Sequence, residues 1–160
     1  MEKQGLFTHI LVPTDGSENS IHAGRLAIRM AALHNSQVTL VYVVDSSTVE
    51  EMAGATSEST DAIRQKLEEK GRRYLDYLAR LARQRSVQPE QVVLHGIPYR
   101  EIADLAREQQ AKLIVIGRVG CRGPRCALIG SVAERVIEYA HCPVLVVSNA
   151  SATDRVSTRR

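Results

Sequence analysis

A glycine-rich segment at residues 117–131, GRVGCRGPRCALIGS, holds the residues best suited to chemistry in this sequence. It carries three arginines and no acidic residue. Glycines let backbone N–H groups approach an anion closely, and the amino end of a following helix adds free N–H donors and a positive dipole. The segment therefore indicates phosphate binding, although a glycine loop can also simply turn the chain and Ser131 can simply cap a helix.

The spacing of these glycines excludes two common phosphate-binding motifs. A Walker A loop needs a Gly-Lys-Ser/Thr ending, and the dinucleotide fingerprint needs G-x-G-x-x-G after the first strand. Neither occurs here. A second polar segment, residues 13–17 (PTDGS), follows the first apolar run. The carboxylate of Asp15 could accept hydrogen bonds from a ribose or a base amine, or it could cap the next helix.

Metal binding and catalysis find little support in the sequence. The five histidines are scattered without ligand spacing, and the three cysteines form no CxxC pair. Cys142 is predicted to pack as a small hydrophobe, whereas Cys121 and Cys126 flank arginines that lower a thiol pKa. Asp15 is the only acid in the two candidate loops, so we expect no enzyme, or at most slow ATP hydrolysis.

Composition narrows the class of protein further. A length of 160 residues predicts one domain over residues 1–150, followed by a flexible basic tail at 151–160. No apolar run approaches the roughly 20 residues of a membrane helix, and no export signal opens the chain, so a cytoplasmic location is expected. Six aromatic residues offer little for base stacking, which disfavours nucleic acid as a partner.

Short apolar runs alternate with amphipathic ones along the chain. The runs at 9–13, 37–44, 91–95, 113–117 and 144–148 predict strands buried on both faces. Apolar residues at helical spacing predict helices over 17–33 and 61–85, with two more opening at Pro98 and at Ser131, where Ser131 and Glu134 have capping-box spacing. Residues 45–60 are polar and poorly periodic and are predicted to be a mobile crossover.

This alternation predicts an α/β fold with an open parallel sheet and helices on both faces. Ligands of such sheets bind beyond the carboxyl ends of the strands, which is where both polar segments lie.

At this point the sequence resembles a known family. Gly117, Gly120 and Gly130-Ser131 match the G-x2-G-x9-G-[S/T] nucleotide signature of the universal stress proteins. The segments VPTDGS at 12–17, GIP at 96–98 and CPVLVV at 142–147 are also similar to blocks of that family, in its order. The resemblance implies a Rossmann-like, five-stranded sheet of order 3-2-1-4-5, related to the adenine nucleotide alpha hydrolases.

The resemblance also implies ATP or another adenine nucleotide as ligand, with or without Mg²⁺, and a regulatory role in the stress response. The alternative is a slow ATPase or a nucleotidyl-transferring enzyme on the same fold. The implied nucleotide-binding residues are Pro13, Thr14, Asp15, Val43, Gly117, Arg118, Gly120, Arg122, Gly130, Ser131 and Val132.

Two kinds of protein partner are expected beside the nucleotide. The apolar run Val144–Val147 should form a sheet edge, and pairing with a second copy would cover it. Family resemblance likewise implies a homodimer through this strand. A regulatory module also implies a protein partner, which the sequence does not name.

Overall fold

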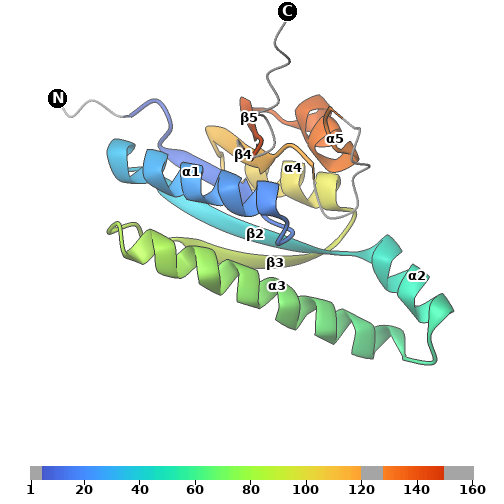
Figure 1. Cartoon of the computed structure of the whole chain (residues 1–160). Helices are drawn as coiled ribbons and strands as arrows, with labels where there is room; N and C mark the ends of the chain where they lie inside the picture. Colours follow the sequence, from blue (N-terminus) through green and yellow to red (C-terminus); the bar gives the residue numbers. More distant parts are fainter. Residues whose placement is uncertain (1–4, 120–127, 150–160) are drawn as a thin grey trace, which may run out of the picture.

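The computed structural model describes residues 5–119 and 128–149. Its centre is a sheet of five parallel strands in the order β3-β2-β1-β4-β5 (Figure 1). The strands are β1 (His9–Pro13), β2 (Gln37–Asp45), β3 (Glu90–Gly96), β4 (Leu113–Gly117) and β5 (Val144–Val147). This arrangement confirms the predicted fold class and strand order.

Within the described residues, five helices lie between the strands: α1 (Glu18–His34), α2 (Ser46–Ala55), α3 (Thr60–Arg83), α4 (Pro98–Glu108) and α5 (Ser131–Tyr139). Helices α1 and α3 cover one face of the sheet, and α4 and α5 cover the other (Figure 1). Successive strand residues point to opposite faces. Ile10 and Val12 accordingly pack with α1 and α3, whereas Leu11 packs with α4 and α5.

Helix α2 corrects the prediction of an irregular crossover over residues 45–60. Asp45 caps this helix, with Oδ1 accepting hydrogen bonds from the Ser47 N–H at 2.9 Å and the Ser47 hydroxyl at 2.7 Å. Val49 is its one buried residue and packs into the core. A short helix that buries a single side chain has no apolar stripe, so the periodicity that identifies longer helices is absent.

The helix starts also differ in detail from the sequence prediction. Ser17, and not Asp15, caps α1 through a hydrogen bond from Ser20 N–H. Gly130 is the N-cap of α5, so Ser131 is already helical and the predicted capping box does not form. Pro98 does begin α4, as expected for a residue whose missing N–H would be unpaired there.

None of the helices in the described ranges is both long and apolar enough to cross a membrane. The predicted tail at 151–160 lies outside the described residues.

Candidate nucleotide site

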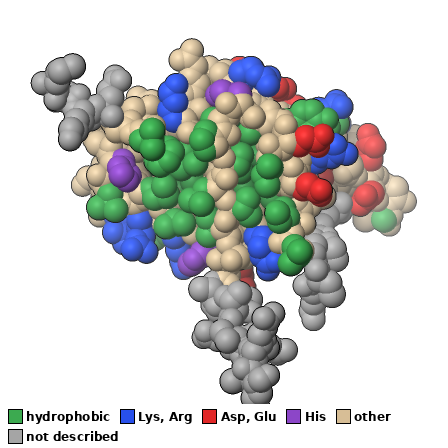
Figure 2. All heavy atoms as spheres, turned by 90° about the horizontal axis from the view of Figure 1, so that it is seen from above, with side chains coloured by type: hydrophobic (Ala, Val, Ile, Leu, Met, Phe, Trp, Pro, Cys, Tyr) green, Lys and Arg blue, Asp and Glu red, His purple; other side chains and the backbone are tan. Residues whose placement is uncertain are grey.

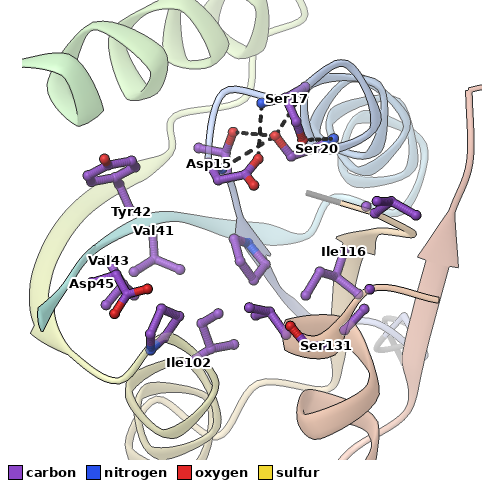
Figure 3. A pocket seen from close by; sticks show the side chains of 18 of the residues that line it. Asp15, Ser17, Ser20, Val41, Tyr42, Val43, Asp45, Ile102, Ile116 and Ser131 are labelled. Carbon is purple, nitrogen blue, oxygen red and sulfur yellow. Dashed lines mark hydrogen bonds between the residues drawn. The ribbon is translucent and has the colours of Figure 1, made fainter. Parts of the chain in front are cut away.

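A cavity of about 290 Å³ lies beyond the carboxyl ends of β1, β2 and β4 (Figure 3). Parallel sheets bind ligands at this edge, where neighbouring strands send their connections to opposite faces. Here α1 follows β1 on one face and α5 follows β4 on the other. The cavity therefore lies at the switch point of the sheet.

The loop from β1 to α1 forms one wall and is held by its own hydrogen bonds. Thr14 N–H donates to Val41 O at 2.9 Å, which extends the pairing of β1 with β2. The Ser20 hydroxyl donates to Ser17 O at 3.0 Å and lies 3.0 Å from the Thr14 hydroxyl. Asp15 Oδ1 accepts from Ser17 N–H at 3.0 Å. These hydrogen bonds hold the loop in one conformation, in which Asp15 lines the cavity.

Two glycines allow α3 and the end of β4 to pack closely against this loop and the start of α1. Gly16 has φ +80°, and a Cβ there would lie 2.1 Å from the Tyr74 ring of α3. A Cβ on Gly117, at the end of β4, would lie 2.7 Å from the backbone nitrogen of Ser20. Gly117 therefore has a packing role against the first turn of α1 in addition to lining the cavity.

The opposite wall is the amino end of α5. Gly130 N–H donates to Arg118 O at 2.7 Å, which fixes the start of α5 against the end of β4. Gly130 offers no side chain as a cap, and within residues 5–119 and 128–149 no side chain accepts a hydrogen bond from the first-turn N–H groups of α5. Ser131, Val132 and Ala133 of that turn all line the cavity. Uncapped N–H groups and the positive end of the helix dipole favour an anion at this wall.

The remaining walls divide into an apolar part and a polar rim. The apolar side chains that line the cavity between the ends of the strands and α4 include Pro13, Val41, Val43, Pro98, Ile102 and Ile116. Figure 3 shows Val41, Val43, Ile102 and Ile116 around this space, with the Asp15 and Asp45 carboxylates at its edge. An apolar slot beside an anion-favouring helix end suits a ligand that is flat and uncharged at one end and anionic at the other.

Nine of the eleven residues predicted from the sequence line this one cavity. They are Pro13, Thr14, Asp15, Val43, Gly117, Arg118, Gly130, Ser131 and Val132. Gly120 and Arg122, together with Cys121 and Cys126, lie outside the described residues. The structure thus brings the two polar segments together, and nucleotide binding by these residues stays a prediction.

Sequence reasoning missed the contribution of α2 and α3. Thr48, Leu67 and Lys70 also line the cavity. Leu67 and Lys70 lie on α3, which packs on the face of the sheet away from α5 and extends past the carboxyl ends of the strands (Figure 1). Thr48 lies on α2, which directly follows β2. No local motif marks such residues. Finding these residues from the sequence would require knowing where α3 lies relative to the loop after β1.

Metal binding and thiol chemistry, the other possibilities considered from the sequence, have little support in the described part of the chain. No cluster of three or more metal-ligating side chains occurs within residues 5–119 and 128–149. Burial raises the pKa of the Cys142 thiol. Cys142 packs against the core on the α4 and α5 side, as predicted for a small hydrophobe.

The profile of the universal stress protein family matches residues 6–148. The chain belongs to this family. Universal stress protein MJ0531 of Methanocaldococcus jannaschii is 40% identical over 145 residues, covering 90% of this chain and 84% of that protein. The resemblance stated from the glycine signature and the VPTDGS segment is therefore confirmed.

Solved structures of relatives agree with the fold. The structure of MJ0577, a second M. jannaschii universal stress protein, superposes with a TM-score of 0.79 at 26% identity, covering 90% of this chain and 97% of that one. The universal stress protein of Archaeoglobus fulgidus in complex with dAMP superposes with a TM-score of 0.62 at 27% identity, covering 89% and 98%.

Proposed function

We propose that this universal stress protein binds an adenine nucleotide, with ATP as the first candidate, and acts as a regulatory module. The observation that carries the proposal is the pairing of an apolar slot with an uncapped helix amino end in one cavity at the switch point. The Archaeoglobus relative solved with dAMP supports an adenine nucleotide as ligand.

The geometry suggests how a nucleotide would lie in the cavity. Phosphates would lie at the first turn of α5, near Gly130, Ser131 and the Arg118 backbone. The base would then occupy the apolar slot formed by Val41, Val43 and Ile102. Asp15, on the loop between these two ends, is placed to accept hydrogen bonds from ribose hydroxyls.

Calorimetry with ATP, AMP and adenosine tests this proposal. Gly130→Val adds a side chain at the buried start of α5 and should abolish ATP binding with little loss of adenosine binding. Gly54→Val, on exposed α2 where a Cβ meets nothing within 4 Å, is the matched control. ATP binding by Gly130→Val equal to that of the parent protein would show that the phosphates bind elsewhere.

Mg²⁺ and hydrolysis are tested on the same samples. The cavity presents two carboxylates, Asp15 and Asp45, which are the ligand type that Mg²⁺ prefers. If Mg²⁺ accompanies ATP, adding it should tighten ATP binding and leave adenosine binding unchanged.

A slow ATPase is the alternative function. It predicts multiple turnovers above the blank that disappear in Asp15→Ala, whereas a binding module shows no turnover in either protein.

We also propose a homodimer through β5, which is an edge strand of the sheet. Ile114 and Arg118 N–H groups donate to Pro143 O and Val147 O. By the alternation of a strand, the Val144 and Val146 N–H groups then point to the free edge. Exposed Ile137 and Tyr139 lie on the adjacent α5, and Figure 2 shows hydrophobic side chains gathered over this side of the molecule.

Val146→Pro tests the dimer, because it removes an edge N–H without removing a hydrogen bond to β4. Sedimentation should show a dimer for the parent protein at micromolar concentration and a monomer for the variant. Nucleotide binding serves as the control for folding. A monomeric parent protein, or a variant dimer as tight as the parent dimer, would exclude this interface.

A further inference from the structure

A second cavity, of about 410 Å³, lies between α1 and α3, which run beside each other on one face of the sheet (Figure 1). It shares no lining residue with the nucleotide cavity. Its lining residues are His22, Arg25, Leu26, Ile28, Arg29, Leu81, Gln84 and Arg85. This α1–α3 groove thus gathers three arginines and a histidine, and no carboxylate lines it.

Arg29 and Arg85 of the groove lack the ion pairs that four arginines elsewhere on the surface form, although Arg73, Arg80, Arg83 and Arg100 also form none within the described ranges. Arg64, Arg72, Arg107 and Arg135 each pair with a carboxylate on their own helix. Arg29 and Arg85 form no ion pair within the described ranges. Arg80 and Arg83 already lie in the last turn of α3, where cations offset the helix dipole. No carboxylate within the described ranges therefore forms an ion pair with any of the three arginines of the groove.

One arginine of the groove is held in place. Arg25 Nη2 donates to the Tyr77 hydroxyl, and its guanidinium lies over the Tyr77 ring, 5.7 Å from the centroid. Neither partner is an anion, so the contact orients the guanidinium without neutralising it. An oriented guanidinium loses less side-chain entropy when an anion binds.

The helices beneath the groove are closely packed. A Cβ on Gly24 of α1 would lie 2.8 Å from both terminal methyls of Leu78 on α3. Ile28 and Leu78 are almost fully buried. This contact fixes the spacing between α1 and α3, and with it the separation of Arg25 and Arg29 from Arg85.

We propose that the α1–α3 groove binds a phosphate-bearing anion with two or more negative charges. Guanidinium groups offer planar pairs of donors that match phosphate oxygens, and several guanidiniums around one cavity suit an ion with several oxygens. Gln84 and His22 add further polar side chains to the lining, and the cavity volume is within the range of small-molecule sites. The groove is separate from the nucleotide cavity, so the proposal stands independently of the proposed function.

Tripolyphosphate is the probe, and amide NMR titration of the full chain is the measurement, because it locates binding by residue. We expect saturable shifts of amides at residues 22–29 and 81–85. The double variant Arg29→Gln/Arg85→Gln should weaken this binding about tenfold or more. Arg64→Gln/Arg107→Gln removes the same charge from paired arginines and is the matched control, in which binding at the groove should be unchanged.

Three results would overturn the proposal. The first is a shift at the groove that rises linearly with tripolyphosphate and never saturates, which indicates charge screening only. The second is an equal loss of groove binding in the control double variant. The third is citrate or a glutamate-rich peptide binding the groove more tightly than tripolyphosphate, which would assign it to carboxylates.

Discussion

Polar side chains have different roles at the two ends of the parallel strands, which are called the carboxyl edge and the amino edge. At the carboxyl edge, polar groups from the segments that follow β1 and β4, from β2 and from α5 surround a cavity. At the amino edge, polar side chains contact one another. His9 Nε2 lies 2.8 Å from Thr39 Oγ1, which lies 2.7 Å from Gln109 Oε1, and Gln109 Nε2 donates to Glu90 Oε2 at 3.0 Å.

The contrast between the two edges distinguishes polar groups that stabilise the fold from polar groups that are available to bind a ligand. The amino-edge cluster joins β1, β2 and β3 with the end of α4 through hydrogen bonds between its own members. Partners at hydrogen-bond distance satisfy a half-buried polar group and stabilise the fold. At the carboxyl edge no side chain of the part of the chain that the structure describes caps the backbone N–H groups of the first turn of α5. Variants at the amino edge should therefore change stability, and variants at the carboxyl edge should change binding.

Gly117→Ala is the exception that should have the largest effect, because this carboxyl-edge residue is also a packing residue. The added Cβ would lie 2.7 Å from Ser20 N and 2.8 Å from Asn19 C, and backbone atoms cannot move aside cheaply. We expect a loss of roughly 3 kcal/mol in the free energy of unfolding, measured with urea, together with weaker nucleotide binding.

Gly54→Ala is the control for this change. Its Cβ meets nothing within 4 Å in the exposed helix α2, so the substitution should raise stability by about 0.5–1 kcal/mol. If Gly117→Ala were as stable as the parent protein, the close approach of β4 to α1 would be wrong.

Much of this arrangement could be predicted from the sequence. The strands are apolar runs with little polar alternation. The bounds of β1 and β4 in the structure match those predicted, and the bounds of the other three strands differ by one residue at one or both ends. The loop residues of the cavity could be predicted because strand order places the ends of β1 and β4 together. Helix α2 could not be predicted, because it buries a single side chain and has no apolar periodicity. The positions of Thr48 and Lys70 at the cavity could not be predicted either, because they depend on tertiary packing and not on a local pattern. The Ser131 cap was wrong because Gly130 precedes it with the backbone conformation of a cap.

Thr39→Val should have the next largest effect and is confined to stability. The side chain is 1% exposed, and valine keeps its shape but removes the hydroxyl between His9 and Gln109. The polar atoms left without this partner should lower the free energy of unfolding by about 1–3 kcal/mol. Nucleotide affinity, measured by calorimetry, should stay the same, and Thr39→Ser should recover part of the stability. A loss of affinity in Thr39→Val would show that the two edges are coupled.

Asp15→Asn should have the smallest effect. In contrast to Thr39→Val, it should change nucleotide affinity and leave the free energy of unfolding unchanged. Asparagine keeps an Oδ1 that can accept the Ser17 N–H hydrogen bond, so the β1 loop and the free energy of unfolding should be preserved. It removes the negative charge that strengthens hydrogen bonds from ribose hydroxyls. Adenosine and ATP should therefore both bind about tenfold more weakly. Equal loss for the two ligands is the informative result, because a ribose contact is common to both. Weakening of ATP alone would instead place Asp15 near the phosphates, and unchanged affinity for both ligands would remove it from the site.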